Sequence, residues 1–354
     1  MNIFTIKKSS GKKRRGEIQT AHGTVETPNL MIVATQGTIK AVSALDLCEW
    51  GSEFIIANTY HLNLRPGLEI LQEAGGLHKF MNWNKTIFTD SGGFQVFSLS
   101  KLRKFKDDGI MFQSHIDGSY HKFTPENNVQ MQRAIGGDVM MVLDECMEFP
   151  VTHAYAKHSV ARTLKWAERS RSEFLKSSPL YGYSQNQFGI IQGSTFSDLR
   201  RMCAEELAGM DFEGYAMGGV AIGESKEYIR RVIDMADDMM PKEKCRYLMG
   251  VGEEDDVRYA VENGFDIFDC VIPTRNARNG ALFTKNGRML IKNAKYKKDF
   301  SPVEEGCECH LCKNYSRAYL HHLFKAGEML GGILASEHNI NYYMRLMKEI
   351  REGI

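Results

Sequence analysis

Short apolar runs rich in β-branched residues alternate along the chain with longer stretches of amphipathic, helical spacing. The apolar runs predict eight strands: Leu30–Val33, Phe54–Asn58, Thr86–Thr89, Val139–Leu143, Phe188–Gln192, Gly214–Met217, Arg246–Gly250 and Ile267–Cys270. The amphipathic stretches predict helices between most of these strands: Ser43–Trp50, Gly67–Ala74, Glu126–Ile135, Thr152–Lys176, Ser197–Ala208, Lys226–Met240 and Glu254–Glu262. Eight strands that alternate with helices are typical of a parallel (β/α)8 barrel, and a doubly wound open sheet is the main alternative.

Two segments depart from this alternation. Residues Met111–Phe123 are typical of a β-hairpin in which Asp117 and Gly118 supply the turn. The first ~25 residues also alternate like strands. We expect this N-terminal segment to cover the bottom or the side of the barrel.

The length and composition of the chain agree with a single large barrel. A chain of 354 residues with 43% hydrophobic residues is long for an ordinary domain, but α/β barrels reach this size. No run of about 18 apolar residues occurs, so we expect no membrane span. The N-terminal stretch MNIFTIKKSSGKKRR carries charges without a following apolar region, which argues against a secretory signal and predicts a cytoplasmic protein.

Positive charge is concentrated in one segment. The formal net charge of +1 argues neither for nor against a nucleic-acid partner, but residues 271–300 hold eight Lys and Arg against one acid, Asp299. The basic residues are Arg275, Arg278, Lys285, Arg288, Lys292, Lys295, Lys297 and Lys298. Such a run is either a solvated face or a phosphate-binding surface, and the pattern alone leaves both interpretations open.

Acids, an amide and glycines end or follow most of the later predicted strands. They are Asp90 after the third strand, Asp144 after the fourth, Gln192 at the end of the fifth, Gly218-Gly219 after the sixth, Met249-Gly250 in the seventh and Asp269 in the eighth. In a (β/α)8 barrel the C-terminal strand ends converge on the active-site face. An Asp after a strand also commonly caps the next helix, which explains any one of these acids taken alone. Three acids on one predicted face favour a shared pocket.

A pocket with three acids has a definite chemistry. Crowded carboxylates repel, so at least one should have a raised pKa unless a cation or hydrogen bonds compensate. One carboxylate can then act as a nucleophile and another as a general acid, which suits displacement at an anomeric carbon. The Gly218-Gly219 pair would let backbone groups approach a flat ligand closely. Phe94 could stack on an aromatic ring, although a Phe at this position is more often part of a core.

Three of the eight cysteines form a cluster near the C-terminus. The spacing is Cys307-x-Cys309-x2-Cys312, and His338 follows after 25 intervening residues. Three thiolates and one imidazole suit a tetrahedral zinc ion with all positions filled, which indicates a structural site. His310 is a rival fourth ligand, but its immediate neighbours would strain chelation, so we favour His338. The alternative is a chance cluster of reduced cysteines.

Ten motifs occur in order along nearly the whole chain. They are NTYHL (Asn58–Leu62), TDSGGFQVFSL (Thr89–Leu99), SHIDGS (Ser114–Ser119), LDEC (Leu143–Cys146), IQG (Ile191–Gly193), MGGVAIGE (Met217–Glu224), LMGVG (Leu248–Gly252), FDCVIPTRNARNG (Phe268–Gly280), the CxCxxC cluster and EHN (Glu337–Asn339). In these motifs the chain resembles the bacterial type of the tRNA-guanine transglycosylase (queuine tRNA-ribosyltransferase) family.

The resemblance implies a fold and an activity. The fold would be an irregular (β/α)8 TIM barrel over residues 29–285, with an N-terminal β-sheet segment over 1–28 and a C-terminal zinc-binding subdomain over 286–354. The activity would be exchange of the wobble guanine of tRNAs with a GUN anticodon for a 7-deazaguanine base, in queuosine biosynthesis. One structural zinc per chain, a homodimer and no membrane association are expected with it.

The resemblance also implies roles for particular residues. Asp269 would be the nucleophile that forms a covalent tRNA–enzyme intermediate, and Asp90 the general acid/base. The base would be held by Asp90, Phe94, Asp144, Gln192, Gly219 and Met249, while Glu224 would hold the peptide just after Gly219. Arg275 and Arg278 would contact the anticodon loop. The zinc ligands would be Cys307, Cys309, Cys312 and His338.

Particular residues and motifs indicate which base is incoming and argue against the rival functions. The bacterial type has Val or a similar residue at Ile222 and Cys at Cys146, whereas the eukaryotic type has Gly in place of the bulky residue. Bulk at Ile222 therefore predicts 7-aminomethyl-7-deazaguanine rather than queuine. The presence of Asp269 argues against a non-catalytic subunit. The PTRNARNG motif argues for tRNA rather than for a DNA-modifying relative or a glycosidase, and a chain ending at Ile354 is not expected to be the archaeal type.

Overall fold

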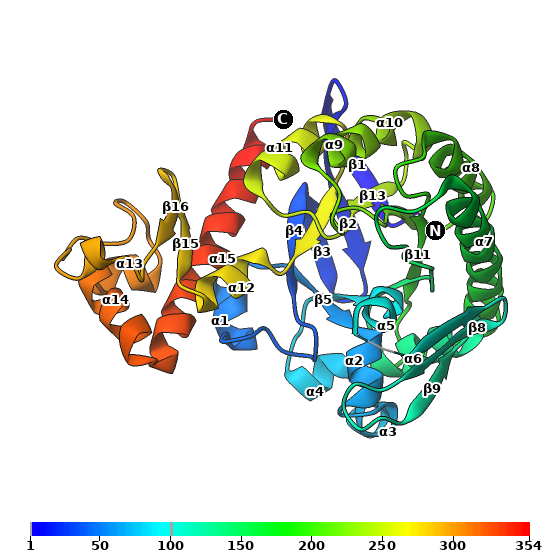
Figure 1. Ribbon diagram of the computed structural model, residues 1–354, viewed down its shortest axis with the longest axis horizontal. Helices are drawn as coiled ribbons and strands as arrows, with labels where there is room; N and C mark the ends of the chain where they lie inside the picture. Colours follow the sequence, from blue (N-terminus) through cyan, green and yellow to red (C-terminus); the bar gives the residue numbers. More distant parts are fainter. Residues whose placement is uncertain (1, 100–101) are drawn as a thin grey trace.

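Eight parallel strands close into a barrel in the computed structural model, which describes residues 2–99 and 102–354 (Figure 1). The strands are β4 (Asn29–Val33), β5 (Phe54–Asn58), β6 (Thr86–Asp90), β10 (Val139–Met141), β11 (Asn186–Ile191), β12 (Gly214–Met217), β13 (Cys245–Leu248) and β14 (Ile267–Cys270). The last strand pairs with the first, with Ile267 opposite Asn29. This closure confirms the barrel and rules out the open sheet.

Some predicted strands run past the hydrogen-bonded ladder. Strand β10 stops at Met141, whereas the apolar pattern predicted it to continue to Leu143. Val142 and Leu143 are buried in the segment after the strand, so they continue the apolar pattern without being part of the strand. Strand β13 stops at Leu248, and Gly250 has a positive φ of 75°. The residues beyond these strand ends form the loops at the C-terminal end of the barrel.

Helices connect the strands as predicted. They include α1 (Ala44–Glu49), α3 (Leu68–Glu73), α6 (Pro125–Ile135), α7 (His153–Lys176), α8 (Ser197–Ala208) and α11 (Glu254–Glu262). The single helix predicted over Lys226–Met240 is two helices, α9 (Lys226–Asp234) and α10 (Ala236–Met239), joined at Met235. Within the described part of the barrel, four short helices were not predicted: α2 (Thr59–Leu64), α4 (Leu77–Met81), α5 (Gly93–Leu99) and α12 (Ile272–Arg278). In the described part of the chain, no helix combines the length and hydropathy that crossing a membrane requires.

The N-terminal strands form a small antiparallel sheet of β1 (Phe4–Ser10), β2 (Lys13–Thr20) and β3 (Gly23–Thr27). The sheet bonds residues at the starts of barrel strands. The hydroxyl of Thr20 lies 2.8 Å from that of Thr86, and His22 Nδ1 lies 2.7 Å from Asp138 Oδ1, just before β10. It therefore covers the bottom of the barrel, opposite the C-terminal strand ends.

The predicted hairpin is part of a three-stranded antiparallel sheet. Strands β8 (Gly109–Gln113) and β9 (Tyr120–Phe123) flank the Asp117-Gly118 turn, and β7 (Arg103–Lys106) adds a third strand that was not predicted. The Phe112 and Phe123 rings meet edge to face at 4.9 Å. These rings belong to a small apolar core between this sheet and the barrel.

The C-terminal part has its own hydrophobic core and stands beside the barrel (Figure 1). Its elements are β15 (Ala281–Thr284), β16 (Gly287–Leu290), the 3-10 helix η1 (Ala294–Tyr296), α13 (His310–Asn314), α14 (Arg317–Ala326) and α15 (Met329–Glu352). The long helix α15 joins the two cores: Leu334 and Ala335 pack in the C-terminal core, whereas Tyr343 and Met347 pack in the barrel core. The residue bounds of the three predicted domains stay a prediction.

Candidate active site and metal centre

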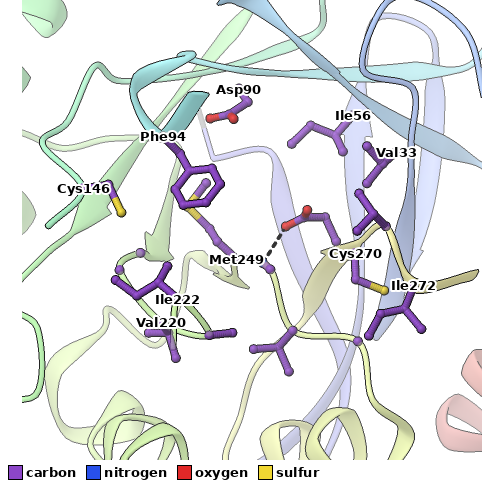
Figure 2. Close-up of a pocket in the computed structure, with 18 of the residues that line it drawn as sticks. Val33, Ile56, Asp90, Phe94, Cys146, Val220, Ile222, Met249, Cys270 and Ile272 are labelled. Carbon is purple, nitrogen blue, oxygen red and sulfur yellow. Dashed lines mark hydrogen bonds between the residues drawn. The ribbon is translucent and has the colours of Figure 1, made fainter. Parts of the chain in front are cut away.

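A cavity of about 600 Å³ opens at the C-terminal ends of the barrel strands (Figure 2). Its wall includes eight of the residues predicted for the site: Asp90, Phe94, Asp144, Gln192, Gly219, Met249, Asp269 and Arg275. They come from strands β6 and β14, helices α5 and α12, and the loops after β10, β11, β12 and β13. Residues that are up to 185 positions apart in the chain thus share one pocket.

Asp269 lies in β14 and is held by two hydrogen bonds. The Tyr247 hydroxyl donates to Oδ1 at 2.6 Å and the Gly250 N–H donates to the same oxygen at 2.8 Å. Burial raises the pKa of Asp269, and the two bonds oppose that rise by stabilising the carboxylate. No described residue bonds Oδ2, so one carboxylate oxygen is restrained while the other is available for reaction.

Asp90 ends β6 and has a different electrostatic environment. The Asn58 side-chain amide donates to its Oδ2 at 3.0 Å. Burial raises the pKa of Asp90 from 3.8 to about 7, and the charges of Asp144 and Asp269 add to the rise. Near neutral pH both protonation states of Asp90 are therefore populated, as a group that must give and later take a proton requires.

Asp144 follows β10 and pairs with Gln192. The Gln192 amide Nε2 donates to Asp144 Oδ2 at 2.7 Å, and Ser91 Oγ lies 3.5 Å from Oδ1. Burial raises the pKa of Asp144 to about 6, although the bond from Gln192 opposes the rise. Among the described residues Gln192 Oε1 has no hydrogen-bond partner despite its burial. This wall of the pocket therefore offers acceptors to a ligand that carries N–H groups.

The helix-cap interpretation does not hold for these acids. Helix α12 has Val271 rather than Asp269 at its N-cap, and α7 begins only at His153, far beyond Asp144. Helix α5 begins at Gly93, whose N–H donates to Ser91 Oγ rather than to Asp90. Asp90 and Asp269 lie at strand ends and Asp144 lies just after one, and these positions bring all three acids into the pocket.

The Gly218-Gly219 pair sits directly against Gln192. Gly219 has a φ of 61°, and a Cβ there would lie 2.4 Å from Gln192 Oε1. A Cβ at Gly218 would lie 2.5 Å from the Ile190 side chain. Only glycine therefore permits this close approach of the two loops.

Phe94 and Met249 project into the cavity (Figure 2). Phe94 lies in the first turn of α5 and is 41% exposed, so it does not belong to the core. Cys146, Val220 and Ile222 line one side of the cavity, and Val33, Ile56, Cys270 and Ile272 line the other (Figure 2). A flat ring with polar edges fits between these apolar walls and the acids.

The loop after Gly219 is held by Glu224. Its carboxylate accepts from the N–H of Ala221 at 2.5 Å and of Ile222 at 2.9 Å. The contact lies farther along the loop than the peptide just after Gly219, where the resemblance implied it. Glu224 therefore fixes the backbone that carries Ile222.

The cysteine cluster forms a compact donor set with His338. Its Nδ1 lies 3.9, 3.5 and 3.4 Å from Sγ of Cys307, Cys309 and Cys312, and the four ligand atoms all lie within 4.8 Å of one another. Tetrahedral zinc with ordinary bond lengths would separate sulfur and nitrogen by about 3.6 Å. The other ring nitrogen of His338 lies 2.7 Å from the Phe283 carbonyl, which orients the ring as in known metal sites. The group fits zinc, and His310 bonds Asn314 instead.

The chain matches one family over almost its whole length. A family model described as Queuine tRNA-ribosyltransferase matches residues 9–354. The chain is 51% identical over 350 residues to the queuine tRNA-ribosyltransferase of Caldanaerobacter subterraneus subsp. tengcongensis, covering 99% of this chain and 92% of that protein. It is 50% identical over 351 residues to the queuine tRNA-ribosyltransferase of Rickettsia bellii, covering 99% and 96%.

The chain belongs to the queuine tRNA-ribosyltransferase family. It is accordingly an enzyme that transfers glycosyl groups, and the barrel with a C-terminal metal-binding cluster is confirmed.

The two arginines predicted to contact tRNA lie on α12, directly after β14. Arg275 is exposed and lines the cavity of this family member. Arg278 does not line the cavity, and among the described residues its Nη1 has no hydrogen-bond partner. Burial and the charge of Arg275 lower the pKa of Arg278. The other basic residues of the 271–300 segment are exposed on the C-terminal subdomain. This exposure agrees both with a solvated face and with a phosphate-binding surface.

The metal cluster and α12 are joined by Asn339. Its side-chain amide donates to the carbonyls of Pro273 and Ala281 at 3.0 Å each, and its oxygen accepts from Phe283 N–H at 3.0 Å. Asn339 follows His338 on α15. A metal that orders His338 would therefore also help to hold the helix that carries Arg275.

Sequence reasoning assigned no role to Asn58 or Tyr247, both of which contact the acids. Asn58 ends β5 within the NTYHL motif, so the strand-end rule could have found it. Tyr247 lies inside β13, where its hydroxyl reaches Asp269 and burial raises its pKa well above the ordinary value. Nothing in the apolar pattern of β13 distinguishes this tyrosine from a core residue.

Loss of the metal should destabilise the C-terminal subdomain. Cys309→Ser is expected to drop the metal content well below one ion per chain and to lower Tm, because structural zinc contributes several kcal/mol to folding. Elemental analysis and calorimetry measure both effects. His338→Ala should behave in the same way, whereas His310→Ala and Cys48→Ser should keep the metal. Metal loss on His310→Ala would make His310 the fourth ligand.

Proposed function

We propose that this enzyme exchanges the wobble guanine of tRNAs with a GUN anticodon for 7-aminomethyl-7-deazaguanine, by double displacement through a covalent Asp269–ribose intermediate. The proposal rests chiefly on the contrast between Asp269 and Asp90 in one cavity. Burial raises the pKa of both acids, but two hydrogen bonds on one oxygen oppose the rise at Asp269, whereas the charges of Asp144 and Asp269 add to the rise at Asp90, whose pKa is about 7. Two carboxylates in one cavity with different hydrogen bonds and different neighbouring charges suit a nucleophile and a general acid.

The first displacement breaks the bond between guanine and ribose. A carboxylate oxygen of Asp269 attacks the ribose anomeric carbon, and the electron pair of the glycosidic bond moves to the leaving guanine. Guanine is a poor leaving group until it is protonated, so Asp90 donates its proton as the bond breaks. The ester to Asp269 retains the energy of the glycosidic bond, so no ATP is needed.

The second displacement reverses the roles. The incoming base loses a proton to the Asp90 carboxylate and attacks the same carbon, and Asp269 leaves as a carboxylate. Two displacements give net retention of configuration. Because the ribose must reach Asp269, the wobble nucleotide has to be flipped out of the anticodon loop, which costs little in a single-stranded loop.

The pocket complements the hydrogen-bonding edge of guanine. Asp144 and the free Gln192 Oε1 supply acceptors for ring and amino N–H groups, and Gly219 presents its backbone. Phe94 and Met249 would cover the two faces of the ring. Arg275, which lines the cavity, and Arg278, three residues later on α12, would contact the anticodon loop. Zinc in the C-terminal cluster and a homodimer are part of the same proposal.

The experiment that tests this function is guanine exchange. Radiolabelled guanine should enter a tRNA with a GUN anticodon and should not enter the same tRNA with adenine at the wobble position. Incorporation into both tRNAs, or into a DNA stem-loop of the same sequence, would contradict the proposal. No incorporation into either would also contradict it.

The incoming base depends on the bulk of Ile222. Ile222 lies with Val220 and Cys146 on one side of the cavity (Figure 2), on a loop held by Glu224. Ile222→Gly should raise kcat/KM for queuine by about 10-fold or more, because removal of the side chain frees several methyl volumes. Assays with labelled queuine and 7-aminomethyl-7-deazaguanine measure this, and Ile222→Val is the matched control. Faster use of queuine by the unaltered enzyme would refute the assignment of the base.

A further inference from the structure

One fully buried arginine behind the base pocket has no role in the proposed chemistry. Arg200 lies on α8, is 0% exposed and makes no ion pair with any described residue. A buried arginine without an acidic partner is unusual and calls for compensation by hydrogen bonds. Its guanidinium donates to four backbone carbonyls: Ser194 at 2.6 Å, Ile191 at 3.3 Å, Gly218 at 3.1 Å and Gly219 at 3.2 Å.

These carbonyls belong to the two loops that carry Gln192 and Gly219. Ile191 ends β11 and precedes Gln192, and Ser194 has a positive φ of 50° two residues later. Gly218 and Gly219 follow the end of β12. Arg200 thus joins the C-terminal ends of two neighbouring strands, at the place where both leave the ladder.

The bonds fix the directions of the peptide planes at the pocket wall. In a planar trans peptide the C=O and the next N–H point in opposite directions. When Arg200 holds the Gly218 carbonyl, the Gly219 N–H must point away from Arg200. The Gly219 carbonyl orients the Val220 N–H in the same way. Neither N–H donates to any other described residue, and both residues line the cavity.

The surroundings leave Arg200 little freedom to move. A Cβ added at Gly193 would lie 2.7 Å from Arg200 Cγ, so the loop packs directly on the side chain. Arg200 Nη1 also lies 3.1 Å from Met217 Sδ. A planar fork with several donors spans both loops, whereas a lysine ammonium has its donors on a single atom and cannot bond all four carbonyls.

We infer that Arg200 is a positioning residue for base recognition, which orients the Gly219 and Val220 N–H groups and the Gln192 loop without touching the base. The inference rests on the proposed function, in which this wall reads the base. Arg200 therefore sets the affinity for the free base more than the affinity for tRNA, which anticodon-loop contacts elsewhere on the enzyme also support. The displacement at Asp269, on β14, does not depend on it directly.

The test compares Arg200→Lys and Arg200→Gln with the unaltered enzyme in the exchange assay. The KM for the incoming base should rise by about 10-fold or more, because misdirected donors lose directional hydrogen bonds. The KM for tRNA should change by about twofold or less, and the covalent adduct with tRNA should still form. Gly193→Ala, which pushes on Arg200 without removing its charge, should raise the KM for the base in the same direction.

Arg246→Lys is the matched control for loss of a buried arginine. Arg246 is also 0% exposed and bonds the carbonyls of Pro241 and Met240, but it also pairs with Asp237 and lies at the other end of the barrel. The Arg246→Lys substitution should lower Tm and leave the KM for the base unchanged. If the Arg200 variants lower Tm while the KM for the base stays unchanged, Arg200 is merely structural and the inference is wrong. If the unaltered enzyme exchanges no base, the proposed function itself fails.

Discussion

Asp269→Ala is expected to abolish base exchange, with a loss of about 10⁴-fold or more, because the variant has no nucleophile for the ribose carbon. The unaltered enzyme, incubated with a GUN-anticodon tRNA, should form a protein–tRNA adduct that survives SDS. The variant should form none. The carboxylate is prepared for this role by the bonds from Tyr247 and Gly250, which favour its ionised form against the opposing effect of burial.

Two further variants make the Asp269 assignment specific. Tyr247→Phe removes one bond to Oδ1, so adduct formation should slow and its acidic pH limb should move to higher pH. Asp198→Ala removes an exposed carboxylate on α8 and should leave the adduct intact. An adduct that persists in Asp269→Ala would transfer the nucleophile role to another acid of the pocket.

Asp90→Asn should reduce kcat by about 10²- to 10⁴-fold while tRNA binding stays close to that of the unaltered enzyme. The amide keeps the shape of the side chain but can neither give nor take the proton. In the unaltered enzyme, guanine release requires Asp90 protonated, so its rate should fall as pH rises through about 7. Single-turnover rates measured from pH 5 to 9 should show this alkaline limb, and the Asn variant should lack it.

The same substitution should alter stability in a pH-dependent way. The pKa of Asp90 is raised in the folded protein, from 3.8 to about 7, so the folded state binds more protons than the unfolded state between these values. The contribution of Asp90 to stability is therefore present at low pH and is lost as pH rises through about 7. Asp90→Asn should raise Tm by a few degrees at pH 8 and have little such effect near pH 4. A fully active Asn variant, or a lower Tm at pH 8, would overturn this account.

The helical and strand patterns predicted the barrel correctly, but they did not predict the details of the segments at the C-terminal ends of its strands. Strands β12 and β14 have the predicted bounds, because short buried strands end where the apolar pattern ends. Helix α5, which follows Asp90, was not predicted, because Gly92 and Gly93 lie at its start and hide its periodicity. Likewise the apolar residues Val142 and Leu143 continue β10 in the pattern although they lie in a buried loop.

The class of fold, the cysteine–histidine cluster and the strand ends that carry polar groups follow from the chain alone, because periodicity, ligand spacing and motif order are local properties. How these groups act on one another depends on the folded arrangement. Asp269 lies 22 positions from Tyr247, and Arg200 lies 18 and 19 positions from the glycine carbonyls that it holds. Burial in a closed barrel raises the pKa of Asp90, and burial and hydrogen bonding depend on three-dimensional neighbours that no local pattern encodes.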